Sequence, residues 1–182
     1  MYRTLIPPRS EVVSFKNVAD HLRLDADHPQ EDVAQMIAAA RGRCEQFIEQ
    51  AIGLQTVEYC PETFSPQVVI PFGPVHEVKT VTYEDDTGTE QSIASYVLKG
   101  DTIQFTDELP SIGTPSNCKI TFTAGFTDEE NEFMAPPQIV SAILLYVGDL
   151  YANREAQFVG TISTINRSAE ALLMPYRRGM GI

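Results

Sequence analysis

Apolar residues recur at three- and four-residue spacing in two long stretches of the chain, which is the spacing of one helix face. In the first stretch, from Pro29 to Gly53, these positions are Val33, Ile37, Ala40, Cys44, Phe47, Ile48 and Ala51. In the second, which opens with Pro136-Pro137, they are Ile139, Ile143, Tyr146, Val147 and Leu150. Proline suits a first helical turn, and Gly53 is expected to end the first helix in the left-handed conformation. The pattern predicts two long amphipathic helices.

Two shorter helices are predicted beside these stretches. Ser14 is a suitable N-cap for a helix that runs to about Arg23. A last helix is expected from Ser168 to Met174, because Pro175 disfavours helical backbone in the residue before it.

Between the helical stretches, short β-type runs alternate with turn residues. The clearest run is Lys119-Ile-Thr-Phe-Thr, in which apolar and polar side chains alternate. Glu84-Asp-Asp-Thr-Gly-Thr has the composition of a hairpin turn. The expected strands are Thr56–Tyr59, Val68–Ile70, Val78–Tyr83, Ser95–Leu98, Thr102–Phe105 and Lys119–Thr123. Six short strands at this spacing favour a small antiparallel sandwich or barrel.

These elements predict an α+β fold, in which a small antiparallel β-sandwich or barrel is inserted into a helical core. The core consists of two N-terminal and two C-terminal helices. The predicted domains are an extended N-terminal arm (1–13), the helical core (14–54 and 135–176), the β insertion (55–134) and a C-terminal tail (177–182). The arm is expected to be extended because Pro7-Pro8 disfavours helix.

Composition and charge limit the classes of function that the chain can have. The chain has 182 residues, of which 43% are hydrophobic and 21% charged, as in an ordinary globular domain. Its net charge of −12 argues against a broad surface for nucleic-acid phosphates, although the segment from Arg167 onward has three Arg and one Glu. The sequence shows no run typical of a secretory signal or a membrane span, so an unexported protein without membrane contact is expected.

The three cysteines indicate a reducing compartment. Cys44, Cys60 and Cys118 are odd in number, far apart and without a Cys-x-x-Cys pair. This spacing favours reduced thiols in a cytoplasm-like environment over a disulfide framework.

One triplet raises the hypothesis of a hydrolase. Asp86-Thr87-Gly88 matches the triplet around the catalytic Asp of aspartic proteases. That chemistry needs two carboxylates that share one proton in an apolar cleft, whereas the flanking residues here are all polar. An exposed hairpin tip explains every residue of the triplet and is the preferred interpretation.

Metal ligation is not supported by the residue spacing. Asp25 and Asp27 match the start of a calcium loop, but Gln30 and Met36 occupy the positions that require Gly and Glu. None of the three histidines has a His or Cys partner at ligand spacing. The sequence therefore predicts no catalytic, cofactor-binding or metal site.

Five groups of residues, spread in order over most of the chain, carry a family resemblance. They are Phe15-Lys16, His21-Leu-Arg-Leu-Asp25, Glu31-Asp32, Ile37-Ala-Ala-Ala-Arg41 and Cys44-Glu-Gln-Phe-Ile48 up to Gly53; Pro71, Pro74-Val75, Val78, Val81 and Tyr83 before Asp-Thr-Gly; Ile120-Thr-Phe-Thr-Ala-Gly125-Phe126; Pro137, Ala142-Ile-Leu-Leu and Leu150-Tyr-Ala-Asn-Arg-Glu155; and Leu172-Leu173 with Pro175-Tyr-Arg177. In order and spacing, these groups resemble the head–tail connector (adaptor) proteins of tailed bacteriophages and prophages.

The resemblance implies a structural, non-enzymatic virion protein at the head–tail interface, assembled in the host cytoplasm. Such subunits form a homo-oligomeric ring, expected to be dodecameric, beneath the portal protein. The ring receives the next head-completion (stopper) or tail protein below it. An acidic composition fits a ring through which DNA passes without specific binding, because carboxylates repel phosphates.

The C-terminal segment is the predicted portal-docking element, as the resemblance implies for related connectors. Tyr176 is expected to fill a pocket while Arg177 and Arg178 pair with carboxylates. The full set of candidates is Leu172, Leu173, Pro175, Tyr176, Arg177 and Arg178. On this hypothesis a chain cut after Arg167 keeps its fold but no longer binds the portal protein. The alternative is a tail that packs on its own helical core.

The β insertion has two competing roles. On the connector hypothesis, it and the proline-containing arm provide the heterologous contacts that a ring requires. On the alternative hypothesis, the protein is a small-ligand or peptide-binding module with a groove in this insertion. An apolar pocket with convergent polar groups would favour the second role.

Overall fold

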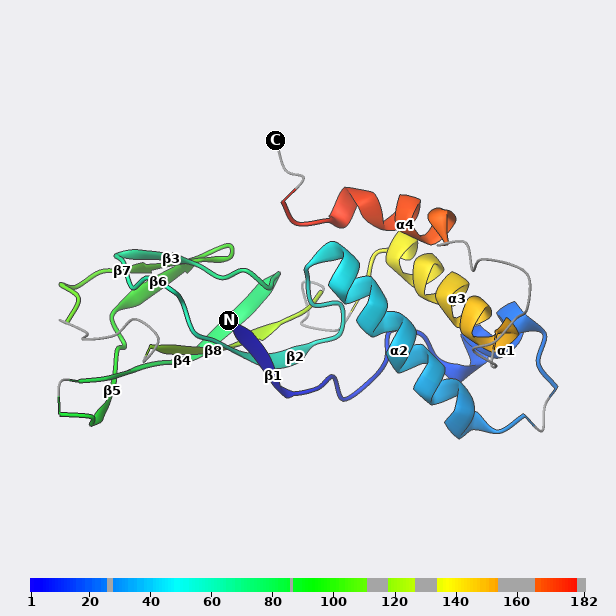
Figure 1. Cartoon of the computed structure of the whole chain (residues 1–182), viewed down its shortest axis with the longest axis horizontal. Coiled ribbons are helices and arrows are strands. Elements are labelled where there is room, and N and C mark those ends of the chain that lie inside the picture. The colour runs from blue at the N-terminus through cyan, green and yellow to red at the C-terminus, as the bar shows by residue number, and fades with distance from the viewer. Residues whose placement is uncertain (26–27, 86, 111–117, 127–133, 154–165, 180–182) are drawn as a thin grey trace. The chain divides into compact units, whose positions relative to one another are not determined.

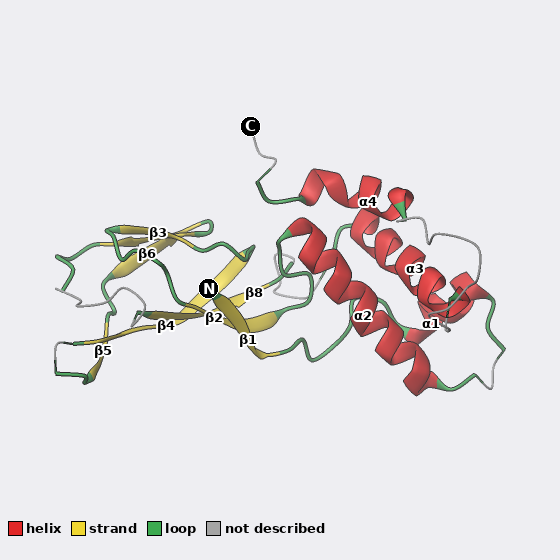
Figure 2. Ribbon diagram, in the orientation of Figure 1, coloured by secondary structure: helices red, strands yellow, loops and turns green. Residues whose placement is uncertain are grey.

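The structure, a computed structural model, describes residues 1–25, 28–85, 87–110, 118–126, 134–153 and 166–179. The chain divides into two compact units, each built from segments that are distant in sequence. The sheet unit consists of Met1–Arg9 and Gly53–Phe133, and the helical unit of Ser10–Ile52 and Met134–Ile182. All described strands belong to the first unit and all described helices to the second (Figures 1 and 2).

The helical unit has four α-helices and a final turn of 3-10 helix. They are α1 (Phe15–Leu22), α2 (Gln30–Ile48), α3 (Pro137–Ala152), α4 (Arg167–Leu173) and the 3-10 helix η2 (Met174–Tyr176). Helix α3 contacts each of the other three α-helices, and its apolar stripe lies in the centre of this unit. The fully buried side chains on α3 include Ile139, Ile143 and Val147. The periodicity of the apolar residues therefore identified the central helix.

The ends of the helices show where local sequence decides and where packing overrides it. Ser14 caps α1 as predicted, and its hydroxyl accepts from the backbone N–H of Asn17. The prediction that Gly53 ends α2 is wrong, because the helix stops at Ile48 and Glu49 adopts the left-handed conformation with φ 57°. This earlier turn returns Ile52 to the buried interior. Its burial offsets the roughly 1–2 kcal/mol that left-handed backbone costs a residue other than glycine.

The sheet unit contains two open antiparallel sheets. Its strands are β1 (Tyr2–Ile6), β2 (Gln55–Tyr59), β3 (Gln67–Val69), β4 (Val75–Glu84), β5 (Glu90–Ser92), β6 (Tyr96–Lys99), β7 (Thr102–Phe105) and β8 (Lys119–Ala124). The larger sheet has the strand order β1-β2-β8-β4-β5 and the smaller one β3-β7-β6. All six predicted strands are present. The sheets are open, so the barrel alternative is not formed.

Burial along β8 follows the alternation that predicted it. Ile120, Phe122 and Ala124 are buried, and the intervening residues are half-buried. This strand pairs with β2 on one side and β4 on the other, so it occupies the centre of the larger sheet. The backbone of a central strand must form hydrogen bonds on both sides, and one of its faces must be buried. Strand β8 meets both requirements.

Two strands were not predicted, and both lie at the edges of the larger sheet. Strand β1 forms within the predicted arm and pairs with β2 from Tyr2 opposite Tyr59 to Ile6 opposite Thr56. Strand β5 pairs with the end of β4. Every residue of both strands is exposed, so neither shows the alternation of apolar and polar positions that marks a half-buried strand.

Candidate assembly surfaces

The C-terminal segment folds back onto the helical unit. The phenol of Tyr176 donates to the side-chain oxygen of Gln138 at 2.8 Å, and its backbone carbonyl accepts from the Gln50 amide. The guanidinium of Arg177 lies 5.4 Å from the ring centre of Phe47. The backbone N–H of Arg178 donates to the carbonyl of Ile48 at 2.8 Å. The tail thus packs on its own helical core, as the alternative interpretation anticipated.

The six predicted docking residues differ in accessibility. Leu173 is completely buried. Leu172, Tyr176 and Arg178 are half-buried, and Pro175 and Arg177 are exposed. Leu173 is therefore a core residue, and only the others present surface to a partner in this conformation.

Burial in α4 bears on the truncation that the connector hypothesis suggests. A chain cut after Arg167 loses Ala169 and Leu173, neither of which has exposed surface. Removing a buried leucine side chain alone costs about 2–5 kcal/mol. We therefore expect such a truncated chain to be destabilised, and docking is better tested with substitutions at exposed positions.

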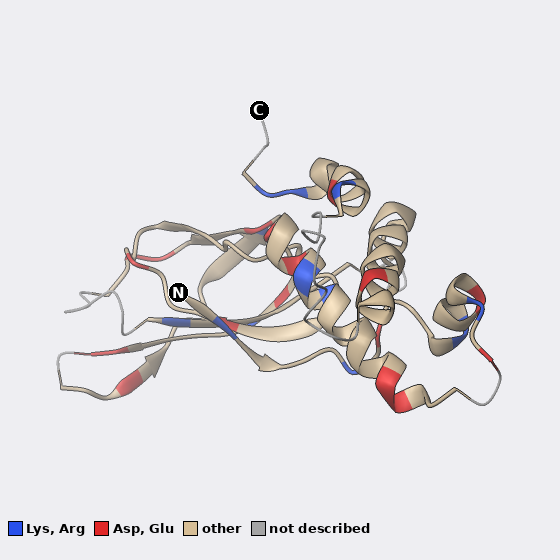
Figure 3. Ribbon diagram, turned by 45° about the vertical axis from the view of Figure 1, so that its right-hand side comes forward, with Lys and Arg blue, Asp and Glu red and all other residues tan. Residues whose placement is uncertain are grey.

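Charge is unevenly distributed within each unit. Figure 3 shows basic residues on the stretch that follows α4, and acidic residues on both strands of the β4–β5 hairpin. The basic stretch contains Arg177, which is exposed. The stretch after α4 and the β4–β5 hairpin therefore offer charged surfaces of opposite sign.

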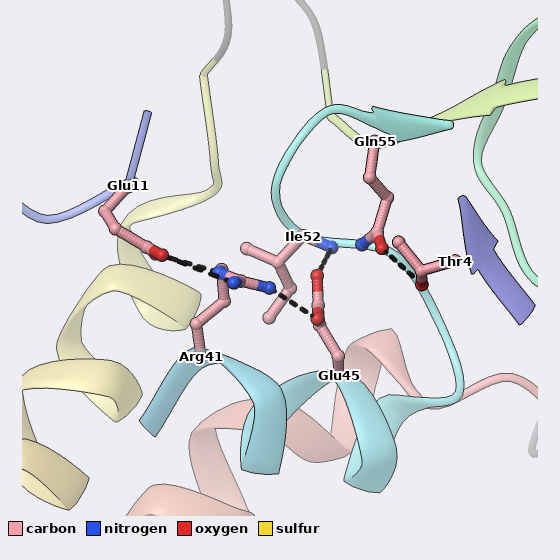
Figure 4. Close-up of polar contacts among 6 residues, drawn as sticks. All are labelled: Thr4, Glu11, Arg41, Glu45, Ile52 and Gln55. Carbon is pink, nitrogen blue, oxygen red and sulfur yellow. Dashed lines mark hydrogen bonds and ion pairs between the residues drawn. The ribbon is translucent and has the colours of Figure 1, made fainter. Parts of the chain in front are cut away.

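A partly buried ion-pair cluster connects α2 to two other segments of the helical unit (Figure 4). Arg41 lies between two carboxylates: its Nε is 2.8 Å from Glu11 Oε2, and its Nη1 is 2.7 Å from Glu45 Oε2. A second hydrogen bond to Glu11, from Nη2, measures 3.2 Å. The other oxygen of Glu45 accepts from the backbone N–H of Ile52 at 2.8 Å. Glu45 therefore binds both Arg41 and the chain beyond the helix.

The electrostatics of this cluster favour the charged forms. Burial alone would lower the pKa of Arg41, but the hydrogen bond to Glu11 and the negative charges of Glu45 and Glu11 raise it above its usual value. Arg41 and Glu45 each expose only 11% of their side chains. Two charges with little exposed surface, joined to each other and to Glu11 by hydrogen bonds, form a structural anchor.

In the sheet unit, the carboxylate of Asp85 organises the hairpin between β4 and β5. Its Oδ1 accepts from the backbone N–H groups of Thr87 at 2.9 Å and Thr89 at 3.0 Å and from the Thr87 hydroxyl at 2.6 Å. Its Oδ2 accepts from the Gln91 amide at 3.1 Å. These bonds, with the one from the Thr87 side chain contributing most, lower the pKa of Asp85 to about 2.

This low pKa is directly testable. Folded Asp85 should titrate near pH 2 in NMR spectra, so its stabilisation of the hairpin should be present above the usual carboxyl pKa and be lost as the pH falls toward 2. Thr87→Val should raise the pKa of Asp85, because it removes the hydroxyl donor. An unchanged titration curve in this variant would show that the hydroxyl has no such effect.

The structure separates the three free thiols by accessibility. Burial raises the pKa of Cys44 and of Cys118 to about 12, whereas Cys60 is only half-buried. We expect one thiol per folded chain to react rapidly with a maleimide at neutral pH and all three to react in denaturant. Mass spectrometry of the labelled peptides should place the fast site at Cys60. Rapid labelling of Cys44 would contradict the packing of α2.

The remaining sequence motifs give no chemical site in the described part of the chain. No group of three or more His, Cys, Asp or Glu side chains there is arranged to hold a metal ion. Asp86 and Asp27 lie outside the described residues. Among the described helices, none combines the length and the apolar character needed to cross a membrane.

Comparisons with known proteins find similarity in structure alone. No family model matches the sequence, and no curated protein matches it. A chain in the neck of an empty GTA particle, computed with C6 symmetry, has a TM-score of 0.80 and 20% identity, with 100% of this chain and 97% of that chain covered. A chain in the virion of a native gene transfer agent (GTA) particle gives a TM-score of 0.80, 21% identity and the same coverage.

A third solved structure, the neck of a native GTA particle computed with C12 symmetry, contains a chain with a TM-score of 0.77 and 20% identity. Again the match covers 100% of this chain and 97% of that chain. Similarity over both whole chains means that the helical unit, the sheet unit and their order along the sequence are all shared. The protein therefore has the fold of a chain found in the neck and virion of gene transfer agent particles.

Proposed function

We propose that this protein is a structural head–tail connector (adaptor) subunit. It forms a homo-oligomeric ring beneath a portal protein and joins the head to the next head-completion or tail protein. The observation that supports this most directly is the full-length match to chains of GTA particle necks, at TM-scores of 0.77–0.80. The groups of residues that resemble head–tail connectors support it independently. The protein acts in the virion, needs no cofactor and performs no catalysis.

The charge of the protein suits a ring through which DNA passes. A net charge of −12 provides few sites for counterion release, so the ring repels phosphates rather than holding them. Nothing in the described residues favours the alternative of a small-ligand or peptide-binding module.

The ring is tested by measuring the molecular mass of the assembly that the intact chain forms. Light scattering after size exclusion should be carried out on the protein alone and mixed with the portal protein encoded in the same genome. We expect a portal-bound ring, visible by negative-stain electron microscopy. A monomer that ignores the portal at micromolar concentration would overturn the proposal.

The exposed face of the C-terminal segment is the proposed portal contact. Arg177 is its exposed cation, and Pro175 beside it is also exposed. Arg177→Glu should weaken portal binding at least about tenfold, because it replaces a cation that pairs with portal carboxylates. Lys16→Glu is the matched control, since Lys16 is an exposed cation on α1. Equal portal binding by both variants would show that the docking surface does not include Arg177.

A further inference from the structure

Strand β1 is an edge strand with an unusually apolar exposed surface. In the described part of the chain it pairs with β2 alone and ends the larger sheet. Tyr2, Leu5 and Ile6 are 45%, 43% and 49% exposed. Figure 1 shows β1 as the dark blue strand beside β2.

Such an edge is normally protected in a protein that stays monomeric. Edge strands expose unpaired N–H and C=O groups, and charged side chains, prolines or very short strands usually prevent them from pairing further. Strand β1 has five residues, and its one charged side chain, Arg3, is held by Glu58 of the neighbouring strand at 2.8 Å. The prolines come only after the strand ends. The edge is therefore suited to accept another strand.

The opposite edge of the same sheet has the complementary charge. That edge is β5, whose three residues are all exposed. Residues 84–90, which lead into β5, include four acidic residues and no basic one. Residues 1–9, which contain β1, include no acidic residue and two arginines, of which Arg3 is paired with Glu58 and Arg9 is exposed. Opposite charges at the two edges favour contact between different edges of two copies and disfavour β5 against β5.

Strand direction fits a rotational arrangement. Four antiparallel pairings separate β1 from β5, so the two edge strands run in the same direction. Copies related by a rotation about a ring axis keep a similar strand direction from one to the next. The contact between β5 of one copy and β1 of the next is then parallel and heterologous, as ring closure requires.

We propose that β1 of one subunit pairs with β5 of the neighbouring subunit, so that the larger sheet continues from copy to copy. This inference rests on the proposed ring and identifies the surface that forms it. Tyr2, Leu5 and Ile6 then become covered by the neighbouring copy. Strand addition supplies affinity through main-chain hydrogen bonds and specificity through the side chains beside them.

The experiment uses two variants of the full chain in which Cys60 is replaced by serine, so that each carries one accessible cysteine while the native Cys44 and Cys118 stay buried. One carries Leu5→Cys on β1 and the other Ser92→Cys on β5. A short bis-maleimide cross-linker is added to each variant alone and to their mixture, under conditions where the wild-type protein forms rings. We expect a cross-linked dimer in the mixture, and neither variant alone should give more than a trace. Cross-linking of the Leu5→Cys variant alone would show two-fold pairing of β1 with β1 and overturn the proposal.

Substitution gives an independent readout. Leu5→Lys should abolish ring formation in light scattering, because it places a solvated charge at the strand contact. Val69→Lys is the matched control: Val69 is 59% exposed on β3, at the edge of the smaller sheet. Intact rings of Leu5→Lys, with no cross-link in the mixture, would refute the edge pairing and leave the connector function standing. A wild-type protein that never forms rings would refute both.

Discussion

Replacing Gly125 with alanine should lower the free energy of unfolding by about 4 kcal/mol. Gly125 has φ +145°, which side-chain-bearing residues rarely adopt and which costs them about 1–3 kcal/mol. An added Cβ would also lie 2.7 Å from Leu54 Cα and 2.9 Å from the Gly53 carbonyl oxygen. These are backbone atoms, which cannot shift without distorting the chain, so crowding adds about 1–3 kcal/mol to the loss of stability. Urea denaturation followed by circular dichroism measures the change.

Two other glycines separate these contributions. Gly88 also has positive φ, at +79°, but no described atom lies within 4 Å of its added Cβ. Gly88→Ala should therefore show only the backbone cost, of about 1–2 kcal/mol. Gly42 lies within α2, where alanine has open space and should stabilise by about 0.5–1 kcal/mol. If Gly125→Ala cost no more than Gly88→Ala, the close approach of the 53–54 backbone would be wrong.

Replacing Arg41 with methionine should cost about 3–5 kcal/mol of stability. The substitution leaves Glu45 in a buried position without its cation and releases Glu11 from α2. Glu45 then keeps its hydrogen bond from the Ile52 backbone N–H but loses the positive charge that offsets its lost hydration, so removal of Arg41 is more harmful than removal of an exposed ion pair. The same denaturation measurement applies.

Arg3→Met is the matched control for this prediction. Arg3 forms an ion pair of the same length with Glu58, at 2.8 Å, but exposes 69% of its side chain. Exposed pairs of this kind contribute about 0–1 kcal/mol, because water screens both charges. Equal losses in the two variants would show that the Arg41 cluster is solvated and is not an anchor.

Much of the fold could be predicted from local pattern. The apolar stripe of α3, the Ser14 cap of α1 and the alternation in β8 each depend on residues close together in sequence. Such signals are strong because helix and strand periodicities decide which face is buried. Strand β1 gave no such signal, since its partner β2 begins about fifty residues later and its own residues are all exposed.

The candidate surfaces were predictable to different extents. The basic tail was visible in composition, but only the structure shows that Leu173 is core and Arg177 is exposed. The Arg41 cluster was not predicted. It joins Glu11 to a residue thirty positions away, and nothing local in either segment indicates that pairing. A basic residue four positions before an acidic one on a predicted helix was its one available signal.

The sequence by itself determined the four α-helices, six of the eight described strands and the order of these elements. It also identified an acidic protein whose motifs lack the context that catalysis requires. It also placed a family resemblance along most of the chain. Tertiary structure alone decided that part of the predicted arm is the edge strand β1 and that α2 ends at Ile48. The physical reason is that strand pairing, buried ion pairs and chain reversal are settled by partners distant in sequence, whose proximity no local pattern encodes.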